Sequence, residues 1–322
     1  MTAPRASILV PTHNKATTLP LAVDSALRQT VADLEVIVIG DGVTDDVRVV
    51  GKELAARDSR VRFLDLAKGP HHGECYRHDA IVDARSNAIF YLCDDDLLLP
   101  EHVEDLLTLL AEHQFAQSFN AFVRPDGSIG FYACDLSRPE SVRLMLRDDL
   151  RYNAVSITGT AHRRDAYLAL NDPWDTTPEG AWPDHHQWRK FFRQPGFTGA
   201  TSDRVTALQF PTSADGRDRW SPEQRLAELS RWHDVVTSAG AQDVVDARVL
   251  TGLRADLVML REAHAVVRWR LARDEAKLKR IRAQRRARRD AQAARLEANR
   301  KARSLRRLFR RGDSPPARRS AV

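Results

Sequence analysis

The first hundred residues alternate between short apolar runs and amphipathic stretches. Residues 6–10 and 35–39 are apolar and rich in β-branched side chains, and they end at Pro11 and at Gly40-Asp41-Gly42. Short runs closed by turn residues are typical of strands buried in a parallel sheet. Between these runs, small and apolar residues recur at helical spacing after a threonine pair that can cap a helix. The pattern predicts a β-α-β unit.

Two further helix-strand pairs follow. Residues 47–57 and 74–84 have helical spacing, and each stretch precedes an apolar run, at 61–66 and at 88–93. This order predicts an α/β fold with a doubly wound, mainly parallel sheet. Ligands of such sheets bind at the carboxyl ends of the strands, so the residues that follow each strand are the first candidates for a site.

The second half of the chain has a different organisation. A helix predicted at 101–113 precedes a strand, turn and strand within 119–136, and the pattern becomes helical from residue 221. Aliphatic residues from Leu253 to Ile281 keep the three- and four-residue spacing of a coiled coil, interrupted by His264 and Asp274. We predict the following domains: an α/β domain at 1–215 with halves 1–113 and 114–215, a helical connector at 216–250, a long basic helix at 251–310 able to form a coiled coil, and a disordered tail at 311–322.

Composition narrows the class of protein. No apolar run approaches the roughly 20 residues of a membrane-spanning helix, and the first residues lack the pattern of a signal peptide. The three cysteines, Cys75, Cys93 and Cys134, have no paired spacing that would indicate disulfides or a zinc site. We therefore expect a cytoplasmic protein.

Charge is distributed unevenly along the chain. Residues 261–322 contain 22 Lys and Arg against 6 Asp and Glu, a net charge of +16, which leaves −10 for residues 1–260. Such a tail predicts an anionic partner, which can be a membrane surface, a nucleic acid or another protein. We favour peripheral contact with the inner face of an anionic membrane, with Leu305, Leu308 and Phe309 at the interface. A helix partner, a homo-oligomer or a free, solvated helix are the alternatives.

Asp94, Asp95 and Asp96 directly follow the apolar run that ends the fourth predicted strand. Three carboxylates held together repel one another, and a divalent cation relieves that repulsion. Carboxylate oxygens suit Mg²⁺ or Mn²⁺, which commonly share their coordination with substrate phosphates. The alternative is a solvated acidic turn in front of the helix near Pro100. We expect these acids to serve a ligand rather than the core.

Two other strand ends carry candidate residues. Asp41 ends the second strand and can accept a hydrogen bond from N3–H of a pyrimidine base, although Gly-Asp-Gly is also an ordinary turn. The residues after the first strand can cradle a base and ribose with backbone groups and an imidazole; they are Pro11, Thr12, His13 and Asn14.

Taken in order, these motifs resemble inverting glycosyltransferase family 2, whose members have the glycosyltransferase A fold of nucleotide-diphospho-sugar transferases. Pro11 to Asn14 is similar to the family's opening Pro-x-Tyr-Asn, with His13 in place of the tyrosine. Gly40 to Asp45 resembles its Asp-Asp-Gly-Ser-x-Asp without the first acid, which leaves base recognition to Asp41. Gly73 followed by Tyr76-Arg77-His78 resembles its Gly and Ala-Arg-Asn, and implies that Arg77 meets the donor phosphates.

The resemblance also extends to the acidic cluster, where Asp94 to Asp96 and Pro100 correspond to the family's Asp-x-Asp and later proline. Counting back from Pro100 makes Asp94 the ribose contact and Asp95 the metal ligand. Reading the three acids as the Asp-x-Asp itself makes Asp96 the main ligand. Both assignments stay open at this point.

The acceptor half is less well marked. Residues 182–188 resemble a family element that opens a helix over the acceptor pocket, which implies that Asp184 is the general base that deprotonates the acceptor hydroxyl. The alternative role for Asp184 is a helix N-cap after Pro183. Trp182 and His185 are candidate acceptor contacts, whereas Trp188 is expected in the core.

The implied reaction is a single displacement with inversion that depends on Mn²⁺ or Mg²⁺. The donor is a nucleotide-diphosphate sugar, with a UDP-sugar preferred, and the acceptor is a glycan or a lipid-linked glycan. No nucleophile elbow, Walker motif or dinucleotide fingerprint is present in the sequence. The competing hypotheses are a non-catalytic sugar-nucleotide or glycan-binding protein and a nucleic-acid-binding protein that uses its basic tail.

Overall fold

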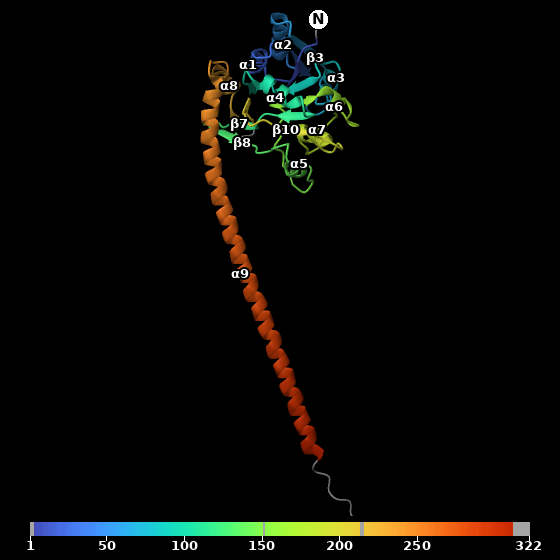
Figure 1. The fold of residues 1–322 in the computed structure, drawn as a ribbon, viewed down its shortest axis with the longest axis vertical. Helices are drawn as coiled ribbons and strands as arrows, with labels where there is room; N and C mark the ends of the chain where they lie inside the picture. Colours follow the sequence, from blue (N-terminus) through green and yellow to red (C-terminus); the bar gives the residue numbers. More distant parts are fainter. Residues whose placement is uncertain (1–2, 151, 213–215, 312–322) are drawn as a thin grey trace, which may run out of the picture. The chain divides into compact units, whose positions relative to one another are not determined.

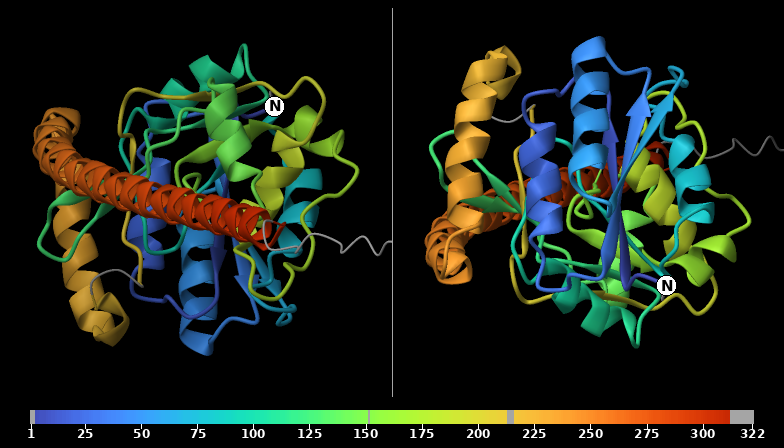
Figure 2. Two further views of the ribbon diagram at one scale, coloured as in Figure 1. Left: turned by 90° about the horizontal axis from the view of Figure 1, so that it is seen from below. Right: turned by 90° about the horizontal axis from the view of Figure 1, so that it is seen from above.

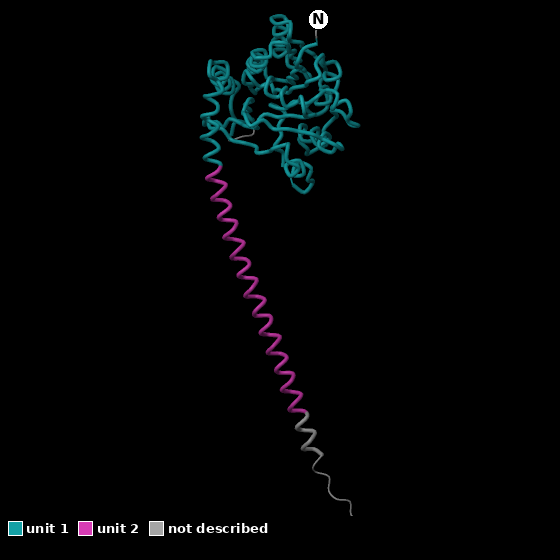
Figure 3. Tube along the Cα trace, viewed as in Figure 1, with its two compact units in different colours: residues 1–256 teal, residues 257–322 magenta. Residues whose placement is uncertain are grey.

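The structure is a computed structural model that describes residues 3–150, 152–212 and 216–311, with side chains described to residue 303. It divides into two compact units, residues 1–256 and residues 257–322 (Figure 3). Residues 216–250, which we took as a helical connector, therefore belong to the larger unit. The predicted tail at 311–322 lies outside the described residues, apart from Arg311 at the end of the last helix.

The larger unit contains two sheets. Within the described residues the strands are β1 (Ala6–Thr12), β2 (Leu34–Asp41), β3 (Val61–Leu66), β4 (Ala88–Tyr91), β5 (Leu97–Leu98), β6 (Phe115–Gln117), β7 (Ala121–Val123), β8 (Ile129–Phe131), β9 (Thr160–Arg163), β10 (Gly199–Thr201) and β11 (Ala207–Gln209). Seven of them form the main sheet in the order β10-β6-β9-β4-β1-β2-β3, and four form a second sheet in the order β5-β11-β7-β8. The main sheet is parallel except for β9, which runs antiparallel to both β4 and β6.

Helices cover both faces of the main sheet (Figures 1 and 2). The helices of the described residues are α1 (Leu19–Leu27), α2 (Asp45–Arg57), α3 (Tyr76–Val82), α4 (His102–Leu110), α5 (Pro139–Met145), α6 (Arg164–Leu168), α7 (Pro183–Phe192), the 3-10 turn η1 (Arg217–Arg219), α8 (Pro222–Val236) and α9 (Ala241–Arg311). Side chains of α1, α2 and α4 share one apolar core with the sheet. Those of α3, α5, α6 and α7 share a second core on the other face. This arrangement confirms the predicted α/β fold.

The predicted elements of the first half are present with small shifts at their ends. β1 and β2 pair in parallel with Thr12 opposite Gly40, and β2 pairs with β3 so that Asp41 lies opposite Leu66. β4 pairs with β1 on its other side, with Leu9 opposite Tyr91. The carboxyl ends of these four strands therefore meet at one edge of the sheet, where the candidate residues lie.

The second sheet and α8 form a third apolar core. Leu97, Leu208, Leu229 and Trp232 pack together in it, and Val245 at the start of α9 is also buried there. α8 lies beside α1, where His233 Nε2 is 2.8 Å from Asp24 Oδ2 (Figure 2). A capping box at Ser221 and Gln224 fixes the start of α8. α8 is therefore a structural part of the larger unit.

The described residues of the smaller unit form the second part of helix α9. α9 continues without interruption to Arg311 and is 71 residues long in all. The large apolar side chains of its second part are exposed, and Leu260, for example, is 67% exposed. Among the described residues no helix is both long enough and apolar enough to cross a membrane.

Candidate active site

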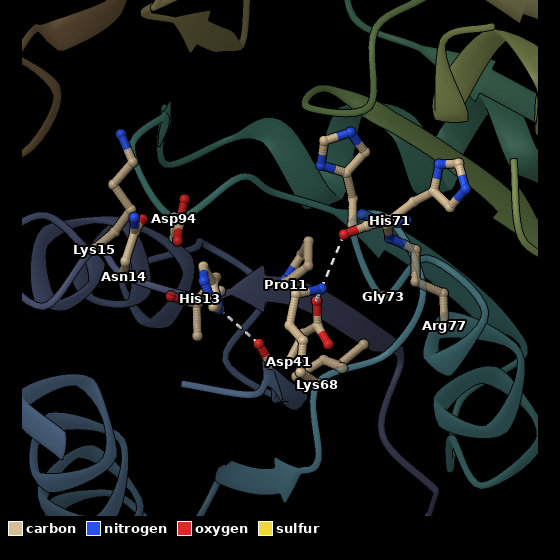
Figure 4. Close-up of a pocket in the computed structure, with 13 residues that line it drawn as sticks. Pro11, His13, Asn14, Lys15, Asp41, Lys68, His71, Gly73, Arg77 and Asp94 are labelled. Carbon is tan, nitrogen blue, oxygen red and sulfur yellow. Dashed lines mark hydrogen bonds and ion pairs between the residues drawn. The ribbon is translucent and has the colours of Figure 1, made fainter. Parts of the chain in front are cut away.

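A cavity of about 270 Å³ opens at the carboxyl ends of β1 and β2 (Figure 4). It is lined by Pro11, Thr12, His13, Asn14, Lys15, Ile39, Asp41, Lys68, His71, His72, Gly73, Arg77 and Asp94. The seven residues that we predicted to contact a nucleotide are all in this set. The structure therefore brings together, at one strand-end edge, residues that are up to 83 positions apart in the sequence.

Asp41 lies at the centre of one wall. Its carboxylate accepts hydrogen bonds from the backbone N of Gly69 at 2.6 Å and from Lys68 Nζ at 2.5 Å. His13 Nδ1 donates to the backbone oxygen of Asp41 at 2.7 Å, which fixes the imidazole against the end of β2 (Figure 4). These contacts hold an acceptor, Asp41, directly beside a donor, Lys68.

Gly73 allows the loop before α3 to pass close to Asp41. Its φ is +61°, and a Cβ at this position would lie 2.3 Å from Asp41 Cγ. Both the backbone conformation and the lack of space require glycine here. The glycine that marked the family resemblance therefore shapes the wall of the cavity.

Arg77 is a buried cation at the cavity. Only 7% of the residue is exposed, and its guanidinium carbon lies 4.7 Å from the centre of the Trp174 ring. Nε and Nη1 have no hydrogen-bond partner within the described part of the chain. Burial lowers the pKa of Arg77, because the charged form has lost its hydration. A buried guanidinium with unused donors is suited to an anionic ligand.

Asp94 is the acid that faces the cavity. It is 9% exposed, and burial together with the charge of Asp95 raises its pKa to about 7. Figure 4 shows it on the same side of the cavity as Lys15, across from Arg77. A carboxylate in this environment is stabilised by a cation.

Asp95 is paired with two cations. Its Oδ2 is 3.1 Å from Lys15 Nζ and 3.0 Å from Arg225 Nη2. Arg225 comes from α8 and also contacts Glu228, which forms an ion pair with the buried Arg217. Arg225, 130 positions away in the sequence, thus helps Lys15 to hold this acid in place.

Asp96 points into the protein. Its Oδ1 accepts from the backbone N of Phe210 at 2.8 Å, and its Oδ2 accepts from Thr158 Oγ1 at 2.5 Å. Burial and the nearby Asp95 raise its pKa to about 7. We expected all three acids to serve a ligand rather than the core, whereas the contacts of Asp96 give it a structural role. In the described residues no group of three or more His, Cys, Asp or Glu side chains is arranged to hold a metal ion.

Asp184 lies in the first turn of α7, next to but not among the residues that line the cavity. The alternative role as N-cap is wrong, because Trp182 is the N-cap residue and Asp184 is the second residue of the helix. Its Oδ1 accepts from the backbone N of His185 at 2.7 Å. Burial raises the pKa of Asp184, while the charge of Arg77 acts in the opposite direction.

The other aromatic and imidazole groups of α7 have mainly structural contacts. His185 is 9% exposed and its Nε2 donates to the backbone oxygen of Met145 at 2.9 Å, so its imidazole is directed into the protein rather than toward an acceptor. Trp182 is 37% exposed and its ring lies 6.2 Å from that of His185. Trp188 is fully buried, which confirms its predicted place in the core.

Several site residues were not predicted from the sequence. Lys15 follows Asn14 directly, and Lys68, His71 and His72 follow β3, so the strand-end rule applied to β3 would have found them. Arg225 is different. It lies in a helical stretch with no motif, and nothing in the local sequence indicates that it meets Asp95.

Comparison with known proteins gives the family. Residues 7–167, half of the chain, match the family described as glycosyl transferase family 2. The chondroitin synthase of Pasteurella multocida is 35% identical over 155 residues, which are 46% of this chain and 16% of that protein. A GalNAc(5)-diNAcBac-PP-undecaprenol beta-1,3-glucosyltransferase of Campylobacter jejuni is 28% identical over 130 residues, 39% of this chain and 41% of that protein. Each match therefore spans less than half of the relative's own length.

Solved structures support the fold. The crystal structure of S. aureus TarS 1-349 superimposes with a TM-score of 0.53 at 15% sequence identity, over 73% of this chain and 72% of that chain. The same protein in complex with UDP-GlcNAc gives a TM-score of 0.51 at 16% identity, over 72% of this chain and 66% of that chain. At this identity the likeness concerns the fold alone. The family match over the strands that build the cavity shows that the chain belongs to glycosyl transferase family 2 and is a glycosyltransferase.

Proposed function

We propose that the protein transfers a sugar from a UDP-sugar to an acceptor hydroxyl of a glycan or lipid-linked glycan, in the synthesis of a bacterial polysaccharide or glycolipid. The observation that carries this proposal is the cavity itself, which combines a hydrogen-bonding wall at Asp41 with a buried cation at Arg77 that has unused donors. A nucleoside diphosphate has the matching pair of groups, a base edge at one end and a negative charge at the other.

The hydrogen-bonding groups of Asp41 and Lys68 favour uracil as the base of the donor. Uracil presents N3–H beside a carbonyl oxygen, which matches the carboxylate of Asp41 beside the ammonium of Lys68. Cytosine presents an unprotonated N3, which a carboxylate repels. We therefore expect uridine and thymidine nucleotides to bind better than cytidine nucleotides.

The diphosphate is assigned to the cationic side chains. Arg77 lines the cavity and brings a positive charge to it that suits phosphate oxygens, and Lys15 lies across the cavity. Gly73 keeps the loop before α3 packed against the Asp41 carboxylate, which shapes this end of the cavity.

A divalent cation fits Asp94 and Asp95 better than Asp96. Asp94 lines the cavity, whereas both oxygens of Asp96 accept hydrogen bonds from the protein. This favours the assignment counted from Pro100, with Asp94 at the ribose and Asp95 at the metal. Mn²⁺ or Mg²⁺ held by one or two carboxylates and the diphosphate would offset the charge that develops on the leaving nucleotide. Lys15 and Arg225 then keep Asp95 oriented.

Asp184 is the proposed general base. It lies close enough to Arg77 for their charges to interact, and its raised pKa makes it a stronger base than an ordinary aspartate. A carboxylate that takes the acceptor proton as the hydroxyl attacks the anomeric carbon gives a single displacement with inversion. No covalent intermediate with the protein is required.

Ligand-induced stabilisation tests the donor. The melting temperature is measured with UDP-, dTDP-, GDP- and CDP-sugars, each with Mn²⁺ and with EDTA, because a ligand at 100 times its Kd stabilises by about 2.7 kcal/mol. We expect the largest shift with a UDP-sugar and Mn²⁺, and release of UDP when a suitable acceptor is added.

Arg77→Gln tests the role of Arg77 in donor binding. Its control is Arg57→Gln, the same exchange on the exposed face of α2. Donor binding should be lost in the first and retained in the second, with both proteins folded. Equal donor affinity in the two variants, or no shift with any sugar nucleotide, would contradict the proposal.

A further inference from the structure

The second part of α9 carries an apolar stripe that is exposed along its whole length. Positions 257, 260, 264, 267, 271, 274, 278 and 281 alternate three- and four-residue steps, so they lie on one face of the helix. Six of these positions are aliphatic, and their side chains are between 36% and 67% exposed; they are Leu257, Leu260, Val267, Leu271, Leu278 and Ile281. We call these eight positions the seam. A regular apolar seam of this kind is a surface for another helix.

The two polar seam residues restrict the partner. His264 and Asp274 lie ten positions apart on the seam and are both exposed. In a parallel pair of identical helices each would face its own copy, which places two carboxylates of Asp274 against each other in the interface. Like charges at such a position are strongly unfavourable.

An antiparallel pair has a different outcome. When Leu257 lies opposite Ile281 of a second copy, Leu260 lies opposite Leu278 and Val267 lies opposite Leu271. In the same register His264 of each copy lies opposite Asp274 of the other, so that one such pair lies on each side of the two-fold axis. All apolar positions then meet apolar positions, and the two polar residues form two identical hydrogen-bonded pairs.

Neighbouring registers do not have this property. A shift by one heptad in either direction places His264 against Ile281 or Val267, and Asp274 against Leu271 or Leu257. Each such shift buries a polar group against an aliphatic side chain without a partner, which is costly. A polar pair within a seam is a known way to specify register.

We propose that residues 257–281 form an antiparallel two-stranded coiled coil with a second copy of this chain, in the register that pairs His264 with Asp274. The interface is self-complementary, as a two-fold dimer requires. Beside the seam, Arg261 lies near Glu275 of the second copy. Arg268 lies near Arg268 of the second copy, and Arg270 lies near Arg270 of the second copy. Moderate salt screens the repulsion within each pair.

Cysteine cross-linking of the full-length protein tests the orientation. Leu257→Cys and Ile281→Cys proteins are oxidised separately and as an equimolar mixture that has been allowed to exchange. In the proposed register only the mixture forms a cross-linked dimer beyond the background of the parent, whose own Cys75, Cys93 and Cys134 supply the control. Cross-linking of each protein with itself shows a parallel pair and overturns the proposal, and so does the absence of any cross-link.

Sedimentation equilibrium tests the seam with two adjacent valines. Val267 is on the seam and 51% exposed, whereas Val266 is off the seam and 48% exposed, so aspartate at either position changes helix propensity and charge equally. Val267→Asp should weaken dimerisation at least about tenfold, because it places two charges in the apolar interface. Val266→Asp should change it by less than about threefold. A monomeric parent, or an equal loss in both variants, overturns the proposal.

Discussion

Asp94 and Asp95 are adjacent, but their surroundings predict opposite effects of neutralisation on stability. The pKa of Asp94 is raised to about 7, so the folded state disfavours its charged form. This penalty is absent well below pH 4 and grows as the pH rises toward about 7. Asp94→Asn should therefore raise the unfolding free energy at pH 8, by about 1–3 kcal/mol, in the absence of ligand.

The control is Asp95→Asn, which weakens the contacts with Lys15 and Arg225 and should lower stability. Urea denaturation of the two variants and the parent gives the comparison. Both variants should also lose most of the stabilisation by UDP-sugar and Mn²⁺. A destabilised Asp94→Asn protein would show that this acid has a structural role like that of Asp96.

Asp184→Asn keeps the shape of the side chain and removes its basicity. Donor binding should be preserved and the transfer rate should fall by roughly 10²-fold or more, as is typical of general base catalysis. Because burial raises the pKa of Asp184, the parent rate should decline on the acid side at a higher pH than for an ordinary aspartate, and the Asn variant should lose this decline. Rates at saturating donor across pH provide the measurement. A rate within about threefold of the parent would assign the base elsewhere.

At this scale the sequence predicted the residues that follow strands and missed those that reach the site from elsewhere. Asp41 is the last residue of β2 and Asp94 follows β4, so a local pattern was sufficient. Arg225 reaches Asp95 through tertiary packing of α8, and one of the two partners of Asp96 is the backbone N–H of Phe210, which leaves no signal in the sequence. The contact of His185 with the Met145 backbone was not predicted, because the spacing of His185 on α7 does not indicate which face of that helix is buried.

Among the structural elements, the loop before α3 depends on one buried carboxylate. Glu74 accepts from the backbone N of His72 at 2.9 Å and of Thr177 at 2.7 Å, which joins the cavity wall to the segment before α7. Hydrogen bonds to its charged form lower its pKa to about 2, although burial acts in the opposite direction. Glu74→Gln should reduce the unfolding free energy by about 1–3 kcal/mol at pH 7, because one buried N–H loses its acceptor.

The pH dependence identifies the cause. A group with a lowered pKa stabilises the fold above its unfolded value of about 4.5 and loses this effect as the pH falls toward about 2. The difference between parent and Glu74→Gln should therefore be constant above pH 5 and shrink below it, as measured by urea denaturation. A difference that does not depend on pH would point to packing instead of charge.

The strands and helices of the first half were predictable because each apolar run is long enough to show its period. β9 was not, since its four residues are mostly polar or small and pair antiparallel between two strands of the parallel sheet. α8 was predicted as a helix, but its membership of the core depends on Leu229 and Trp232 meeting the second sheet, which no local pattern shows.

For the whole molecule, the concentration of positive charge in residues 261–322 still predicts contact with an anionic membrane surface. The side chains of Leu305, Leu308 and Phe309 lie outside those that the structure describes, whereas the basic residues from Arg282 to Arg303 are on an exposed helix. A chain that ends at Ala283 should keep donor turnover and lose sedimentation with anionic liposomes at low salt, since each basic residue near such a surface contributes about 1 kcal/mol. Neutral liposomes are the control. If the full-length protein ignores anionic liposomes, a protein partner is the better assignment.

The hydrogen bond from the Phe210 backbone to Asp96 has a consequence for how this enzyme can be recombined with its relatives. The family match ends at residue 167, yet Phe210, one of the two residues that hold Asp96, and the helix whose Arg225 pairs with Asp95 both come after residue 200. A chimera that exchanges only the matched region would put a foreign acidic cluster on supports that evolved with another one. Exchange at a boundary after α8 would transfer the acids together with their supports, and is the division at which we expect donor use to be inherited intact.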